Sequence, residues 1–193
     1  TVIEERGGLG MKHLLESGSV DPAAVVLGEA THGDICIGHR GRAEIEIVIE
    51  GIAGHASAPE RASNALDLLG DVLAAVRDVA RERATDPVLG EETLVATMVD
   101  VLPETRNVIP DHVVVAVDWR VLPGTDEPSL LARLRSHVHA RVGTLPMGLT
   151  YDVRLATERQ RTYTGLEEDV GLFSPGFLMH AEHPVVRAAA RAA

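Results

Sequence analysis

The sequence predicts an α+β fold, in which a unit of order β-α-β-β-α-β occupies residues 41–157 of the 193-residue chain. Stretches of alternating apolar and polar residues, typical of half-buried strands, are separated by two stretches in which apolar residues recur at helical spacing. Glycine and proline mark the boundaries between these stretches. The length of the chain and its composition, 45% hydrophobic and 24% charged, fit a folded protein with a core rather than a disordered one.

The first half of this unit is predicted to be strand, helix and strand. Residues 42–50 alternate Ile45, Ile47 and Ile49 with glutamates and a valine, which is the pattern of a strand with one wet face. Residues 62–83 are predicted to be helical, because five apolar side chains share one helical face: Leu66, Leu69, Leu73, Val76 and Val79. Residues 93–102 are rich in β-branched residues and predict the second strand.

The second half is predicted to be strand, helix and strand again. Residues 112–121 place Val113, Val115, Val117 and Trp119 on one side of a strand. Residues 128–142 predict a helix that begins near Pro128 and turns Leu130, Leu131, Leu134 and Val138 inward. Residues 148–155 again alternate between apolar and polar residues and predict the last strand. The whole unit is therefore predicted to be ferredoxin-like, with two helices on one face of a four-stranded antiparallel sheet.

The flanking residues are predicted to belong to a larger α/β domain into which this unit is inserted. Residues 23–29 form an apolar run ending in Glu29, as expected of a fully buried parallel strand. Residues 158–182 are predicted to be irregular, and a helix begins after Pro184. We therefore expect residues 1–40 and 158–193 to be pieces of that domain. The chain opens at Thr1 without Met, so we expect a piece of a longer protein.

Charge and cysteine content narrow the classes of function. The 29 acidic against 18 basic residues give a net charge of −11, which disfavours general binding to nucleic acid or to anionic membranes. No apolar run approaches the roughly 18 residues of a membrane helix. Cys36 is the only cysteine, so no internal disulfide can form, which fits a reducing compartment and predicts a cytoplasmic protein. With no evident base nearby, Cys36 is predicted to be a small buried hydrophobe.

Acidic side chains near the start of the chain are candidates for metal chemistry. Glu4 and Glu5 precede a glycine-rich turn, and Glu29 ends the predicted buried strand. Of two adjacent carboxylates, one can bind a cation while the other takes a proton from a metal-bound water. Exposed acidic residues on loops are the alternative interpretation.

Three further residues are candidates for contacts with a substrate. His55 lies among small residues in GHASAP at 54–59, where its imidazole can donate to a developing oxyanion. Asn107 begins the string NVIP. Arg120 follows Asp118 by two residues on the same strand face, so the carboxylate can hold an arginine that grips an anionic substrate end-on. The alternative interpretations are that His55 is a loop histidine with no functional role and that Asp118 and Arg120 form a surface salt bridge.

Taken in order, these strings resemble those of the M20 family of metallopeptidases and amidohydrolases. That family includes acetylornithine deacetylase, succinyl-diaminopimelate desuccinylase, aminoacylase and glutamate carboxypeptidase. The matching strings are EERGGLG at 4–10, GEAT at 28–31, GHASAP at 54–59 with NAL at 64–66, NVIP at 107–110 and DWR at 118–120. Each string is weak alone, but five in this order across nearly the whole chain make the resemblance specific.

The resemblance implies that residues 41–157 are the lid and dimerisation domain of a dinuclear zinc hydrolase, with cobalt or manganese as alternative metals. Glu4 would be the general base, while Glu5 and Glu29 would each ligate one zinc ion. His55 would reach across a homodimer and stabilise the tetrahedral intermediate in the partner's site. The remaining pair, Asn107 and Arg120, would contact the substrate.

The implied reaction is hydrolysis of an amide bond by metal-activated water, in a small carboxylate-bearing substrate such as an N-acyl amino acid or a dipeptide. The family's remaining metal ligands should lie upstream of Glu4 and beyond Ala193. His32-Gly33-Asp34 follows the glutamates, which is the wrong order for the missing motif. We therefore expect residues 1–193 to be inactive alone, although the parent should be a hydrolase. A dimerisation module of a degenerate hydrolase and a ligand-binding regulatory domain are the alternatives.

Overall fold

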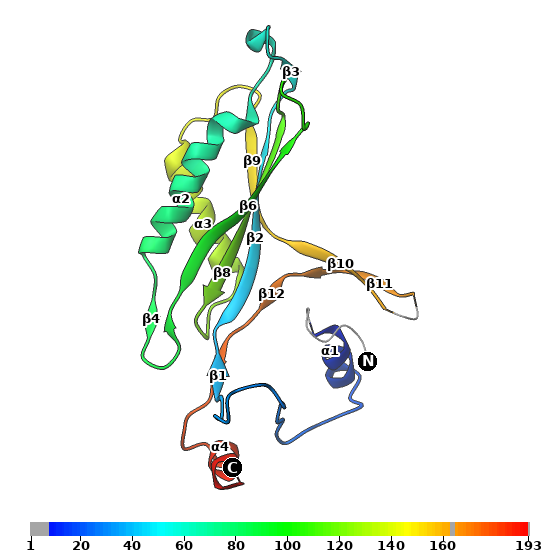
Figure 1. Ribbon diagram of the computed structural model, residues 1–193, viewed down its shortest axis with the longest axis vertical. Coiled ribbons are helices and arrows are strands. Elements are labelled where there is room, and N and C mark those ends of the chain that lie inside the picture. Colours follow the sequence, from blue (N-terminus) through cyan, green and yellow to red (C-terminus); the bar gives the residue numbers. More distant parts are fainter. Residues whose placement is uncertain (1–7, 163–164, 193) are drawn as a thin grey trace.

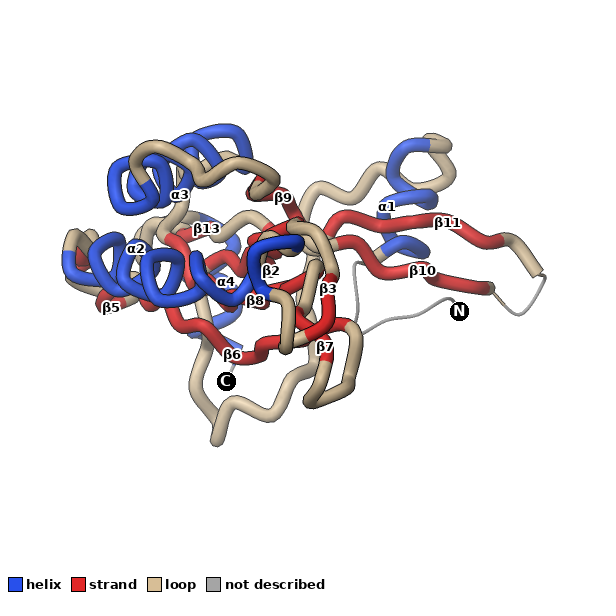
Figure 2. Tube along the Cα trace, turned by 90° about the horizontal axis from the view of Figure 1, so that it is seen from above, coloured by secondary structure: helices blue, strands red, loops and turns tan. Residues whose placement is uncertain are grey.

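The computed structural model describes residues 8–162 and 165–192. Its long elements follow the predicted order β-α-β-β-α-β, which confirms a mixed α/β architecture. Figure 1 shows the two long helices side by side on one face of a sheet, and Figure 2 shows the same layering from above. These elements are β2 (Gly41–Glu50), α2 (Leu69–Arg81), β6 (Thr93–Leu102), β8 (His112–Val121), α3 (Glu127–Val142) and β9 (Thr150–Leu155).

The sheet is antiparallel and is built around the β2–β8 pair. These strands pair over their whole length, from Gly41 opposite Val121 to Glu50 opposite His112. β6 lies on the far side of β8, with a register shift between Ala96 and Met98. The other side of β2 is shared by β9 and by the short β12 (Phe173–Ser174). Among the described strands, none pairs with the outer edge of β6.

The core lies between the sheet and the two helices, as the alternation of apolar and polar residues along β2 and β8 predicts. One residue in two along these strands faces the helices and is almost completely buried. The helices contribute the facing apolar residues. The largest fully buried side chains are Trp119, Ile45, Ile47, Ile49, Leu134, Val72, Val79, Val113, Val115, Val117, Val121 and Val138.

The start of the first helix differs from the prediction. Residues 65–68 form a 3₁₀ turn, η2 (Ala65–Leu68), and the α-helix begins only at Leu69. Because a 3₁₀ turn has three residues per turn rather than 3.6, it shifts the phase of the side chains before the helix. Leu68 is therefore buried, whereas Leu66, predicted to lie on the buried face, is 37% exposed.

Short strand pairs extend the fold at its edges. β1 (Gly38–His39) pairs with β13 (Phe177–Leu178), so the chain enters and leaves the sheet side by side. A Cβ at Gly41 would lie 2.5 Å from the Gly176 nitrogen, a spacing that only glycine permits. The other short elements are α1 (Leu9–Glu16), β3 (Gly54–His55), η1 (Pro59–Arg61), β4 (Thr85–Asp86), β5 (Gly90–Glu91), β7 (Val108–Ile109) and α4 (Pro184–Ala192).

Residues 158–182 are more ordered than predicted. β10 (Thr157–Arg161) and β11 (Glu167–Gly171) form a hairpin that projects from the sheet in Figure 1, and β12 and β13 follow it. Cross-strand ion pairs hold the hairpin, including Arg159 Nη2 to Glu167 Oε2 at 2.9 Å. Because these contacts are ionic, apolar periodicity could not reveal the hairpin. The helix predicted after Pro184 is confirmed as α4.

The predicted buried strand at 23–29 is wrong for the described structure. Residues 23–29 have no strand structure and are all exposed, with Val26 82% and Leu27 74% exposed. A strand needs a neighbour for its backbone hydrogen bonds, and none of the described strands lies along this segment. Cys36 is exposed as well, contrary to the prediction that it is buried. None of the helices in residues 8–162 and 165–192 has the length and apolar character of a transmembrane span.

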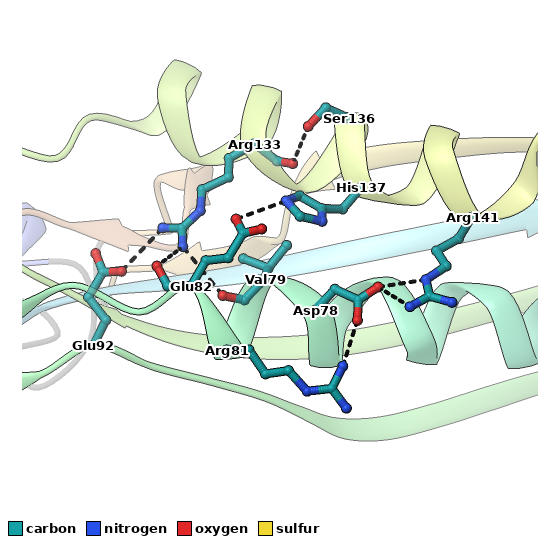
Figure 3. A network of polar contacts seen from close by, with 9 residues as sticks. All are labelled: Asp78, Val79, Arg81, Glu82, Glu92, Arg133, Ser136, His137 and Arg141. Atoms are coloured by element: carbon teal, nitrogen blue, oxygen red, sulfur yellow. Dashed lines mark hydrogen bonds and ion pairs between the residues drawn. The ribbon is translucent and has the colours of Figure 1, made fainter.

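A network around Arg133 ties α3 to the end of α2 (Figure 3). One guanidinium nitrogen, Nη1, lies 3.2 Å from Oε2 of Glu92, which is only 5% exposed. The other, Nη2, donates to the carbonyls of Val79 at 3.3 Å and Glu82 at 2.6 Å. The Val79 carbonyl lies in the last turn of α2 and also accepts the Glu82 N–H at 3.0 Å, whereas Glu82 is the residue that follows the helix. The Arg133 guanidinium also lies 5.4 Å from the centroid of the Trp119 ring.

We predict that Arg133→Met destabilises the protein by about 2 kcal/mol or more, because it removes the charged partner of the buried Glu92 carboxylate and the side-chain donor to the Val79 and Glu82 carbonyls. Urea unfolding followed by circular dichroism would measure the change. Arg81→Met is the matched control, since the Arg81 side chain is 71% exposed and, in the described structure, pairs with a single carboxylate, that of Asp78. Equal effects of the two substitutions would contradict a structural role for the network.

Candidate functional site

His55 and Asn107 lie together at one end of the sheet, which is called the tip here and is the end near β3 in Figure 1. The pairing of β3 with β7 places His55 opposite Val108, the residue after Asn107. The backbone N–H of Ala56 donates to the Asn107 carbonyl at 3.0 Å, which continues the pairing by one residue. Both side chains are exposed. Residues 52 positions apart in sequence are thus neighbours at the tip.

Each tip side chain has a local hydroxyl contact. The Nδ1 atom of His55 lies 2.8 Å from Ser57 Oγ and accepts the backbone N–H of Ser57 at 3.2 Å. The Oδ1 atom of Asn107 accepts the hydroxyl of Thr105 at 2.6 Å. Nothing in the sequence pattern singled out Ser57 or Thr105 as contact residues, because such contacts depend on the loop conformation.

Arg120 lies at the opposite end of β8, called the base here. Its Nε atom donates to Asp118 Oδ1 at 2.7 Å, as the two-residue spacing predicts. Arg42, which the sequence did not single out, donates from Nε to the other oxygen of Asp118, also at 2.7 Å. Arg42 also lies 2.8 Å from Glu44 Oε1. The β2–β8 register explains this cluster, because it sets Arg42 directly opposite Arg120.

The arginines stabilise the charged form of Asp118. Burial raises the pKa of the Asp118 carboxyl. Hydrogen bonds and charge from Arg42 and Arg120 together lower it by more than burial raises it, so the pKa lies below its ordinary value of 3.8. The hydrogen bond to Asp118 likewise raises the pKa of Arg42, against the smaller effect of burial. Asp118 is therefore a fixed anion that holds two cations opposite each other.

The cluster lines a hollow of about 750 Å³ on the face of the sheet that carries no helices. The lining includes Arg42, Glu44, Asp118 and Arg120, together with Phe173 of β12. Asp118 accepts from the Nε of Arg120 and, at 3.4 Å, from its Nη2, so Nη1 and the second N–H of Nη2 remain as the groups that can meet a ligand. The side chain of Arg120 is 42% exposed. The geometry therefore allows Arg120 to bind an anionic group end-on.

The tip and the base are too far apart to act on one small molecule. Arg120 is eight residues along β8 from His112, which corresponds to about 27 Å at the usual rise of a strand. His55 and Asn107 lie beyond His112, at the end away from Arg120. The structure therefore brings Asn107 next to His55 and not next to Arg120, with which the sequence analysis grouped it as a substrate contact.

The acidic candidates form no closed metal site in the described structure. Glu4 and Glu5 lie outside the described residues. Glu29 is exposed in a segment without secondary structure. Within residues 8–162 and 165–192, no group of three or more His, Cys, Asp or Glu side chains could hold a metal ion. The described residues thus contribute one carboxylate of the predicted metal set and do not by themselves fit a two-metal cluster.

Comparison with known proteins places this fold. The model of the M20 peptidase dimerisation domain matches residues 37–144, more than half of the chain. The chain belongs to the M20 family. Among its curated relatives, the uncharacterised protein YgeY of Escherichia coli K12 is 26% identical over 186 residues, which cover 96% of this M20 chain and 44% of YgeY. A succinyl-diaminopimelate desuccinylase of Phenylobacterium zucineum is 35% identical over 109 residues, covering 52% of this chain and 28% of the relative.

Solved structures resemble this M20 chain in fold. A hydantoinase/carbamoylase-family amidase of Burkholderia multivorans aligns with a TM-score of 0.53 at 22% identity, over 81% of this chain and 33% of the amidase. The aminopeptidase PepT of Bacillus cereus aligns with a TM-score of 0.52 at 20% identity, over 81% of this chain and 35% of PepT. The M20 chain thus spans less than half the length of these relatives.

We predict that Asp118→Asn lowers the free energy of unfolding by about 2 kcal/mol at neutral pH, because two facing arginines lose the anion between them. The folded pKa of Asp118 is lowered, so its contribution is complete above the unfolded value of 3.8 and disappears as pH falls through the folded value. The gap between wild type and variant should therefore shrink below about pH 4.

Urea unfolding of both proteins between pH 7 and pH 2.5 would measure this gap. Asp152→Asn, which changes an exposed carboxylate on β9, is the control and should change stability by less than about 0.5 kcal/mol. A gap that stays constant down to pH 2.5 would refute the assignment of a lowered pKa.

Proposed function

We propose that this chain is part of a metal-dependent M20 hydrolase that cleaves an amide bond in a small carboxylate-bearing substrate, as a deacylase or a peptidase. The family match and the relatives named as desuccinylase, deacetylase and peptidase support this class of reaction. Within it, residues 41–157 would be the ferredoxin-like lid and dimerisation domain. Residues 1–40 and 158–193 would belong to the catalytic α/β domain.

The observation that carries this proposal is the separation of the tip from the base. Arg120 is suited to bind the carboxylate of a substrate, and His55 with Asn107 is suited to donate to the oxygen that becomes negative. The tip lies beyond His112, which is itself about 27 Å along β8 from Arg120, so a small substrate cannot meet both sets of groups within one subunit. A homodimer in which the tip of each subunit enters the partner's site would supply both sets of groups to every substrate.

In this mechanism the chain's own residues bind and orient the substrate and transfer protons. Arg120, oriented by Asp118, would hold the substrate carboxylate. His55 of the partner subunit would stabilise the tetrahedral intermediate, and Glu4 would take a proton from the attacking water. Two zinc ions, or cobalt or manganese, would polarise water and carbonyl when bound. Glu5 and Glu29 would each supply one ligand, the rest coming from outside residues 1–193.

One observation favours a second candidate, a non-catalytic dimerisation module in a degenerate hydrolase. The dimerisation-domain fold is intact, whereas the described residues contain no group able to hold a metal. Metal analysis of the intact parent separates the two proposals. About two zinc ions per subunit would support the hydrolase, and a metal-free, inactive parent would support the module.

A subunit-mixing experiment tests whether His55 acts across the dimer. In the parent protein, His55→Ala and Arg120→Ala should each be nearly inactive. Co-expressed subunits form mixed dimers in which one site has an intact Arg120 and receives the partner's intact His55. Half of randomly formed dimers are mixed and each keeps one of two sites, so we predict recovery of about one quarter of wild-type activity.

The control is a mixture of His55→Ala with His55→Ala,Arg120→Ala subunits, in which no intact His55 exists and no activity should return. If His55 acted within its own subunit, every site of the first mixture would carry one defect. Activity no higher than that of the control would then refute the shared site.

The outer edge of β6 is the surface we propose for dimerisation. Among the described strands it has no pairing partner, and an open edge of this length can pair with a second copy of itself. Apolar side chains along the strand are exposed: Val95, Met98 and Val99. An isologous pairing of two β6 strands would join the two sheets into one.

We predict that Val99→Lys weakens the dimer at least about tenfold, because a lysine on an edge strand opposes strand pairing. Sedimentation equilibrium of the wild type and the variant would measure the dissociation constant. Leu166→Lys, which alters a residue 61% exposed at the end of the β10–β11 hairpin, should leave it unchanged. A dimer unaffected by Val99→Lys would exclude the β6 edge.

A further inference from the structure

The hydroxyls of Ser57 and Thr105 lie against the acceptor atoms of the two tip residues. Ser57 Oγ is 2.8 Å from His55 Nδ1, and Thr105 Oγ1 donates to Asn107 Oδ1 at 2.6 Å. In each case the hydroxyl belongs to a residue two positions away in the same loop. The contacts are therefore local to each loop and do not depend on what binds at the tip.

The contacts at His55 determine which ring nitrogen carries the proton of the neutral imidazole. The backbone N–H of Ser57 points at Nδ1 from 3.2 Å, and a backbone N–H can only donate. Nδ1 must therefore accept, which leaves the ring proton on Nε2. The Ser57 hydroxyl then acts as a second donor to Nδ1. Within the described chain no contact engages Nε2, so its N–H is available to a ligand.

The amide of Asn107 is restrained by a hydroxyl, Thr105 Oγ1, rather than by a backbone N–H. Its oxygen accepts the Thr105 hydroxyl, and the amide nitrogen retains two N–H groups that can donate. An unrestrained side-chain amide could present either its oxygen or its nitrogen to a ligand. The Thr105 contact favours the nitrogen.

We infer that Ser57 and Thr105 are positioning residues that make the tip a donor-only site, in which His55 Nε2–H and Asn107 Nδ2–H are presented to an anionic oxygen. Donors that are already oriented need no rearrangement when negative charge develops on a bound oxygen. The identity of that oxygen as the substrate oxyanion rests on the proposed function. The tautomer of His55 does not, and it can be measured on residues 1–193 alone.

Nitrogen NMR of the ¹⁵N-labelled chain, at a pH where the imidazole is neutral, reports the tautomer directly. We expect the Nε2–H form to dominate for His55. Ser57→Ala should lower the ratio of Nε2–H to Nδ1–H by roughly fivefold, the effect of one ordinary hydrogen bond, and Ser57→Thr should restore it. Ser129→Ala, at the start of α3 and away from the tip, removes a hydroxyl that donates to the Asp126 carbonyl and is the matched control. A ratio unchanged in Ser57→Ala would overturn the inference.

Activity of the parent enzyme supplies the second measurement. Ser57→Ala and Thr105→Val should each lower kcat by roughly fivefold with little change in KM, and Ser57→Thr and Thr105→Ser should restore it. Suppose that Ser57→Ala shifts the tautomer but the parent enzyme stays fully active after His55→Ala. That combination would support the positioning role of Ser57 and refute the proposed function. An unshifted tautomer would refute the positioning role whatever the activity.

Discussion

The pairing of β2 with β8 is the constraint on which the rest of the structure depends. Ten consecutive residues of each strand face each other without a bulge, from Gly41–Val121 to Glu50–His112. One face of this pair supplies most of the sheet's buried side chains, against which α2 and α3 pack. A slip of one residue would turn those side chains toward water, so the register is strongly specified.

The same register positions the groups on the open face. It sets Arg42 against Arg120 at the base, an arrangement of like charges that is tolerated because Asp118 lies between them with a lowered pKa. It also fixes the distance from the base to the tip, where His55 and Asn107 meet through a separate short pairing. The strand pair thus acts as a spacer between the base and the tip, and this separation supports the proposal of a site shared between two subunits.

Periodicity predicted the elements that bury apolar side chains, and it failed where other forces decide. The strands at 42–50 and 112–121 and the helix at 128–142 agree with the structure because one face of each is packed. The strand at 93–102, most of which is exposed, was indicated by its β-branched residues instead. The β10–β11 hairpin was missed because ion pairs hold it, and the run at 23–29 was misassigned because a strand also needs a neighbour. At the site, the Asp118–Arg120 contact follows from spacing within one strand. The contacts of Arg42 and Ser57 depend on cross-strand register and loop conformation, which one sequence does not reveal.

The antiparallel pairing of β1 with β13 has a consequence for how such proteins evolve. It holds the two ends of the sheet unit next to each other, locked by the close approach of Gly41 and Gly176. A folded module whose ends are adjacent can be accommodated within a surface loop of a host, or lost from it, while the host chain keeps its path. The sheet unit could therefore be inserted into another protein as a whole. The insertion point would be the β1–β13 pair, next to the close contact of Gly41 and Gly176.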